Sequence, residues 1–115
     1  MAFDDLEIKR NENALAQFLA RRRPPPHIRD QLDIACKSSG QSVEIVEVRA
    51  DRKEPTRKIE APVAKATFVR AKNHWNVYWM RADFKWHGYE PNREVKTLES
   101  FLDVVDQDKH GCFFG

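Results

Sequence analysis

Apolar positions recur at two different periods along the chain, and each period predicts a different kind of element. Residues 4–22 carry an apolar stripe at helical spacing, and Asp4 and Glu7 are spaced as in a capping box. Three consecutive prolines follow, and they cannot continue a helix because proline lacks the backbone N–H. The pattern predicts a helix over residues 4–22 and a proline-rich linker over residues 23–28.

Between residues 31 and 90 the apolar positions alternate with polar ones, which is typical of β-strands. The Ser-Ser-Gly-Gln stretch at 38–41 supplies turn residues between the first two apolar runs. We expect five strands in consecutive antiparallel order, within residues 31–37, 43–49, 63–71, 75–80 and 84–89. Short connections between neighbouring strands predict a meander.

The clearest amphipathic pattern lies in residues 97–107, where apolar side chains recur at helical spacing after Thr97, a good N-cap residue. We expect this second helix to pack on one face of the sheet. An apolar tail, residues 111–115, ends the chain. The predicted fold is a single α+β domain over residues 1–115, with a five-stranded antiparallel meander sheet and a helix at each end.

Residues 74–89 hold all three tryptophans and give the sheet its most unusual strand pair. If the turn centres on Ala82 and Asp83, Trp79 lies opposite Trp86. The strand pair then has a core face and a second face, and a shift of one residue would exchange the faces of one strand. The expected core face carries Trp75, Val77, Trp79 and Trp86. The expected second face carries Asn76, Tyr78, Met80, Lys85, His87 and Tyr89.

The charge balance limits which partners can be inferred. Twenty Lys and Arg oppose eighteen Asp and Glu, so the net charge of the 115 residues is only +2. A polyanion would therefore need a local basic patch. The sequence has neither an apolar run long enough for a membrane span nor a secretory signal, so we expect a cytoplasmic protein with two reduced cysteines.

Rings and cations on one strand face can stack bases and neutralise phosphates. We therefore hypothesise a non-enzymatic binding module whose favoured ligand is nucleic acid. The same residues also fit a solvated sheet face and an ordinary helix C-terminus. The candidate contact residues are Tyr78, Lys85, His87 and Tyr89 on the sheet, with Arg21, Arg22, Arg23 and Arg29 around the prolines.

Two other functions stay open. A protein-interaction module would use a sheet edge and the apolar tail, and the chain could be a monomer or a homodimer. A small metal-dependent hydrolase or nuclease would use Glu47, Asp83, Lys85 or His87. The sequence assigns no catalytic residue, cofactor or metal ligand, because it has no nucleophile elbow, no phosphate loop and no paired zinc ligands beyond His110 and Cys112.

Several segments resemble a bacterial family known as domain of unknown function 3024. The likeness is carried by Lys65–Phe68, Trp75–Tyr89 and Gly111–Gly115, and by Gly40–Ile45 and Glu47–Arg49. It runs from about Arg23 to the C-terminus and departs from the family at Ala50–Lys53, a loop where a proline is expected. The resemblance implies a stand-alone bacterial protein, and it supplies neither an activity nor catalytic residues.

Overall fold

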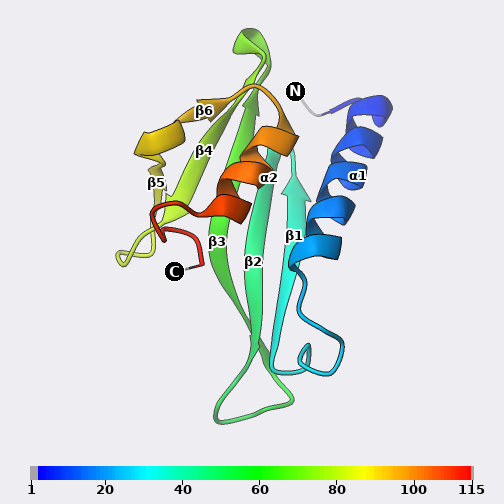
Figure 1. The fold of residues 1–115 in the computed structure, drawn as a ribbon, viewed down its shortest axis with the longest axis vertical. Helices are drawn as coiled ribbons and strands as arrows, with labels where there is room; N and C mark the ends of the chain where they lie inside the picture. Colours follow the sequence, from blue (N-terminus) through cyan, green and yellow to red (C-terminus); the bar gives the residue numbers. More distant parts are fainter. Residues whose placement is uncertain (1–2, 115) are drawn as a thin grey trace.

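The computed structural model of the protein describes residues 3–114 and confirms an α+β fold built on one antiparallel sheet (Figure 1). Strands β1 to β5 lie in the sheet in chain order, as a meander requires, and a short β6 pairs with β4. The elements are α1 (Asp5–Arg22), β1 (Leu32–Ser39), β2 (Ser42–Ala50), β3 (Lys58–Val69), η1 (Arg70–Lys72), β4 (His74–Met80), β5 (Trp86–Gly88), η2 (Glu90–Asn92), β6 (Glu94–Val95) and α2 (Leu98–Gln107).

Helix α1 begins at the predicted capping box. The backbone N–H of Glu7 donates to Asp4 Oδ1 at 2.8 Å, and the N–H of Asp4 donates to Glu7 Oε1 at 3.0 Å. Arg23 is extended, with a ψ of 133°, as expected of a residue that precedes a proline. Local sequence chemistry therefore sets both ends of this helix.

Strands β1 and β2 form the predicted hairpin, joined by the two-residue turn of Gly40 and Gln41. Gly40 has a φ of +58°, a conformation that glycine adopts without the cost a Cβ would add. Strand β3 begins at Lys58, earlier than expected, and contains Pro62. Pro62 is tolerated because β4 pairs with β3 only from Ala64 onward, and because the β2–β3 register shifts beside it at a bulge.

The predicted register between β4 and β5 is wrong by one residue. Trp79 lies opposite His87, and Met80 lies opposite Trp86. The connection is longer than a two-residue turn: the N–H of Phe84 donates to Arg81 O at 2.9 Å, and Phe84 itself is left-handed with a φ of +60°. The shift turns the side chain of Trp86 away from the expected core and brings His87 toward it.

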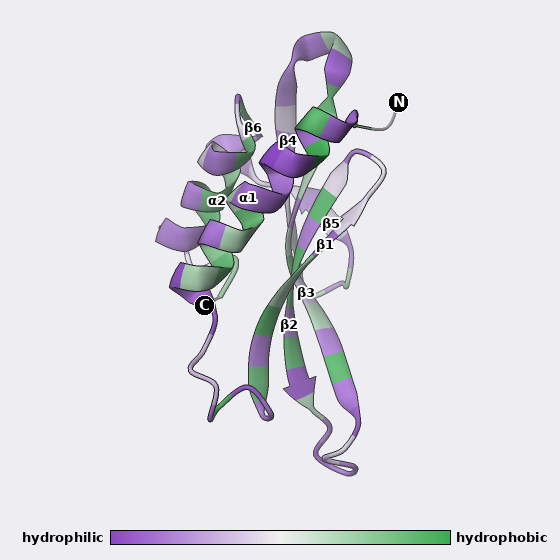
Figure 2. Cartoon of the chain, turned by 90° about the vertical axis from the view of Figure 1, so that its right-hand side faces the viewer, coloured by the Kyte–Doolittle hydropathy of each residue, from purple (hydrophilic) through white to green (hydrophobic). Residues whose placement is uncertain are grey.

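Both helices pack on the same side of the sheet, which we call the inner face (Figure 2). The opposite side is called the outer face. The core between helices and sheet is built from Leu15 and Phe18 of α1, Phe101 and Leu102 of α2, and strand residues such as Val43, Ile45, Ala64, Ala66 and Val77. The apolar stripes of the two helices turn toward the strands, as their helical spacing predicts (Figure 2). In the described part of the chain, no helix has both the length and the apolar composition needed to cross a membrane.

The C-terminal tail folds back onto the domain instead of projecting from it. Phe113 is 7% exposed, and its ring lies 4.8 Å from the ring of Tyr89. Both carboxylate oxygens of Asp108 accept backbone hydrogen bonds, from Phe113 N–H at 3.1 Å and from Phe114 N–H at 2.8 Å. Phe113 and Phe114 therefore contact their own domain. They are the main aromatic residues of the apolar tail that was predicted to serve as a docking surface. Gly115 lies outside the described residues.

Candidate nucleic-acid interface

The outer face of the sheet faces away from both helices. Strand register places on it Lys37 of β1, Glu44 of β2, Lys65 of β3, Tyr78 and Met80 of β4, and Trp86 of β5. Most of these side chains are partly exposed. An antiparallel sheet with one packed face leaves its other face free for water or for a ligand.

A lysine and two aromatic rings form the most distinctive group on the outer face. Lys65 Nζ lies 5.7 Å from the ring centroid of Tyr78 and 5.8 Å from that of Trp86, within the range of cation–π attraction. Lys65 and Tyr78 are direct partners across β3 and β4, and Trp86 follows on β5. Three adjacent strands therefore hold one cation between two rings.

A depression of about 260 Å³ lies next to this group. It is lined by Asn76, Tyr78 and Gly88 together with Arg93 and Glu94. Gly88 contributes no side chain beside Tyr78, and a Cβ built there would meet nothing within 4 Å. The space beside the tyrosine ring is therefore open and has hydrogen-bonding side chains at its rim.

The predicted shared face of Tyr78, Lys85, His87 and Tyr89 does not form, because the β4–β5 register differs from the prediction. Tyr89 is 2% exposed in the core, and burial raises the pKa of its hydroxyl. His87 lies on the inner-face side opposite Trp79, and Lys85 lies in the turn before β5. Of these four residues, only Tyr78 belongs to the outer face.

The four candidate arginines bind other parts of the domain. Arg21 Nε and Arg22 Nη1 lie 3.3 Å and 3.6 Å from the carboxylate of Asp106 on α2. Arg23 donates two hydrogen bonds to Asp33 of β1, at 2.9 Å and 2.8 Å. Arg29 Nε donates to the carbonyl of Pro24 at 2.8 Å, and Arg22 also lies over the ring of Phe114. This cluster joins α1 and the linker to their neighbours on the inner-face side, away from Tyr78.

The acidic and basic residues considered for hydrolysis come together only in part. His87 Nε2 lies 2.8 Å from Asp83 Oδ2, and this hydrogen bond lowers the pKa of Asp83. Glu47 binds Arg49 on β2 instead, at 3.1 Å. Within residues 3–114, no group of three or more His, Cys, Asp and Glu side chains is arranged to hold a metal ion. Burial raises the pKa of Cys36 to about 11, which leaves this thiol a poor nucleophile at neutral pH.

Sequence reasoning did not place Lys65 and Trp86 in the candidate site. The alternation of apolar and polar residues along β3 could have indicated Lys65, because it places this side chain on the opposite face from Ala64 and Ala66. Trp86 could not be placed without the length of the β4–β5 connection. That connection is set by a local motif in which Asp83 Oδ1 accepts from the N–H of Lys85 at 3.0 Å.

Comparison with known families matches nearly the whole chain to one family model. The model is described as Domain of unknown function (DUF3024), and the match covers residues 3–115. No curated protein and no solved structure matches the chain at a significant level. The chain belongs to the DUF3024 family.

Proposed function

We propose that the protein is a non-enzymatic module that binds single-stranded nucleic acid on the outer face of its sheet. The observation that carries this proposal is the position of Lys65 between the partly exposed rings of Tyr78 and Trp86. Unpaired bases stack on aromatic side chains, and a neighbouring cation attracts the phosphates.

The spacing of these groups suits a single strand better than a duplex. Tyr78 and Trp86 lie on neighbouring strands of the sheet, so two successive bases can each find a ring. The depression beside Tyr78 adds the amide of Asn76, which can both donate and accept hydrogen bonds at a base edge. A duplex hides its base faces in stacking and would gain little from the exposed rings.

The charge of the outer face sets the expected strength of binding. Lys37 is paired with Glu60, and Glu44 lies across the strands between Lys37 and Lys65. Few cations are therefore available for phosphates, and stacking must supply most of the affinity. We expect weak to moderate affinity with a shallow dependence on salt.

Fluorescence anisotropy with labelled single-stranded DNA, single-stranded RNA and duplex DNA tests the proposal at about 50 mM and about 200 mM salt. We expect both single strands to bind more tightly than the duplex. Trp86→Ala should weaken binding by roughly tenfold or more, because stacking on one ring contributes about 1–3 kcal/mol. Lys65→Gln should reduce the salt slope by about 0.7, the value of one phosphate contact on a single strand.

Lys9→Gln is the matched control, because it removes one exposed positive charge from α1, which packs on the other side of the sheet. It should leave the affinity unchanged. Absence of binding to either single strand at the lower salt concentration would overturn the proposal. Equal loss of affinity in Lys9→Gln and Lys65→Gln would show that binding follows overall charge and not this face.

A further inference from the structure

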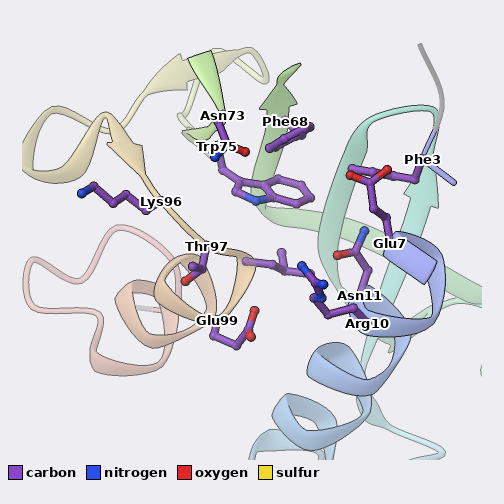
Figure 3. A pocket seen from close by; sticks show the side chains of 11 residues that line it. Phe3, Glu7, Arg10, Asn11, Phe68, Asn73, Trp75, Lys96, Thr97 and Glu99 are labelled. Atoms are coloured by element: carbon purple, nitrogen blue, oxygen red, sulfur yellow. The ribbon is translucent and has the colours of Figure 1, made fainter. Parts of the chain in front are cut away.

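A cleft on the inner-face side of the molecule is separate from the proposed nucleic-acid interface. It has a volume of about 170 Å³ and lies between the N-terminal ends of α1 and α2 and the turn that joins β3 to β4 (Figure 3). Its lining combines aromatic rings on one side with polar side chains from both helices. A ligand that fits both kinds of surface needs an apolar part and a polar part.

Three packed rings form the apolar side of the cleft. Phe3 stacks on Trp75 with ring centroids 5.5 Å apart, and Phe68 lies 5.7 Å from Phe3 and 5.3 Å from Trp75. Phe3 and Phe68 remain partly exposed, although they pack against the core. An apolar group in the cleft would remove their remaining exposed area from water, which favours binding.

The indole N–H of Trp75 is an unused donor in this wall. The residue is only 5% exposed, yet its nitrogen has no hydrogen-bond partner within residues 3–114. A buried tryptophan N–H ordinarily finds a partner. In the described residues no fully buried side-chain nitrogen or oxygen lacks one, so this N–H must reach an accessible surface. Because Trp75 lines the cleft, the cleft is the surface that the N–H reaches.

Further donors surround the same space. Arg10 and Asn11 extend from α1 into the cleft below the ring of Trp75, whereas Lys96, which precedes the N-cap of α2, lies at the edge of the cleft with its ammonium group directed away from the ring (Figure 3). Within the described part of the chain, none of these three side chains has a hydrogen bond or a close ion pair, although the charge of Arg10 contributes to lowering the pKa of Glu7. The N-terminus of α2, whose dipole favours negative charge, opens at Thr97 on the same cleft.

The acidic residues of the cleft do not cancel this positive character. Glu7 is bound by Arg70 at 3.0 Å, and this hydrogen bond lowers the pKa of the glutamate. Glu99 is the remaining carboxylate in the lining, which also holds the two cations Arg10 and Lys96. The cleft therefore offers several hydrogen-bond donors and the guanidinium of Arg10 beside an apolar wall.

We propose that this cleft binds a small organic carboxylate. The apolar body of the ligand lies against Phe3 and Phe68, and its carboxylate accepts hydrogen bonds from the Trp75 N–H and from Arg10. A cavity of about 150 Å³ holds benzene, so a ligand with one small ring fits the available space. The volume is below the roughly 300 Å³ of a typical pocket for a drug-sized ligand, so we expect the ligand to be small.

A titration with benzoate, followed in the ¹H–¹⁵N NMR spectrum of the labelled protein, tests the proposal directly. The three indole signals are assigned by elimination with Trp79→Phe and Trp86→Phe, which leave Trp75 intact. We expect benzoate to shift the Trp75 indole signal along a saturable curve. Benzamide, which has the same shape without the charge, should bind about tenfold more weakly or worse, because charged hydrogen bonds are the stronger ones.

Variants of α1 give the matched comparison. Arg10→Gln should weaken benzoate binding by about tenfold, whereas Lys9→Gln, which removes the same charge outside the cleft lining, should leave it unchanged. A Trp75 signal that does not respond to benzoate would overturn the proposal. So would equal binding of benzoate and benzamide, or equal affinities in Arg10→Gln and the parent protein. None of these readouts depends on nucleic acid.

Discussion

The two hydrogen bonds that Asp108 accepts from the C-terminal tail should control the stability of this end of the domain. Asp108 ends α2 with a left-handed φ of +42° and accepts the N–H groups of both Phe113 and Phe114. Its replacement should free the tail and uncover Tyr89. Two variants separate the contributions: Asp108→Ala removes both acceptors, and Asp108→Asn keeps one and tolerates the left-handed conformation.

The expected loss in the free energy of unfolding has two sources, the lost hydrogen bonds and the backbone conformation at residue 108. Each hydrogen bond to the carboxylate contributes about 1.5 kcal/mol, the lower end for charged partners because Asp108 is only partly buried. Forcing alanine into a left-handed conformation costs about 1 kcal/mol more. We therefore expect Asp108→Ala to lower the free energy of unfolding by about 4 kcal/mol and Asp108→Asn by about 1.5 kcal/mol.

Urea denaturation measures these losses, and alkylation by iodoacetamide shows whether the tail has been released. Burial, with a smaller contribution from Asp108, raises the pKa of the Cys112 thiol, so both variants should alkylate faster at Cys112. Cys36, whose pKa is raised to about 11 by burial, serves as the internal control and should stay slow. If Asp108→Ala changes neither the free energy of unfolding nor the reactivity of Cys112, the claim that Asp108 holds the C-terminal tail is refuted.

Three further predictions concern charge, packing and backbone conformation. Asp33 has a lowered pKa because Arg23 donates hydrogen bonds to it, so its contribution to stability is present above the ordinary carboxyl pKa and is lost as pH falls through the lowered value. Arg23→Gln should therefore reduce the acid-side loss of stability, measured by urea unfolding from about pH 7 to about pH 2; an unchanged acid-side loss would contradict this. Phe101→Ala, at a side chain with 0% exposure, should cost about 3–5 kcal/mol in thermal or urea unfolding. Phe84 is 87% exposed and left-handed, so Phe84→Gly should instead gain up to about 1 kcal/mol, and a loss would contradict the strain assigned to it.

The sequence predicted the parts of the fold that depend on local chemistry. Asp4 and Glu7 mark the start of α1, Thr97 marks the start of α2, and Gly40 marks the first hairpin turn. In each case a side chain or a backbone conformation acts within a few residues. The alternation of β1 and β2 then predicted their pairing, because one face of each strand had to be buried.

Features that depend on the length of a connection or on distant contacts were not predictable in the same way. The turn before Trp86 is longer than the two-residue turn that was assumed, and this one-residue difference exchanged the faces of Trp86 and His87. Tyr89 is buried because Phe113 packs on it from the end of the chain. For the same reasons the observed outer face differs from the predicted binding face. Tyr78 belongs to both, but Lys65 and Trp86 stand beside it in place of His87 and Tyr89.

The most direct test of the proposed function compares two tryptophan signals in one NMR titration with single-stranded RNA. Trp86 belongs to the outer face with Tyr78 and Lys65, whereas Trp75 lies in the core beside the helices. We predict that the RNA shifts the indole signal of Trp86 and leaves that of Trp75 unchanged. A shift of Trp75 without a shift of Trp86, or no shift of either signal, would contradict it.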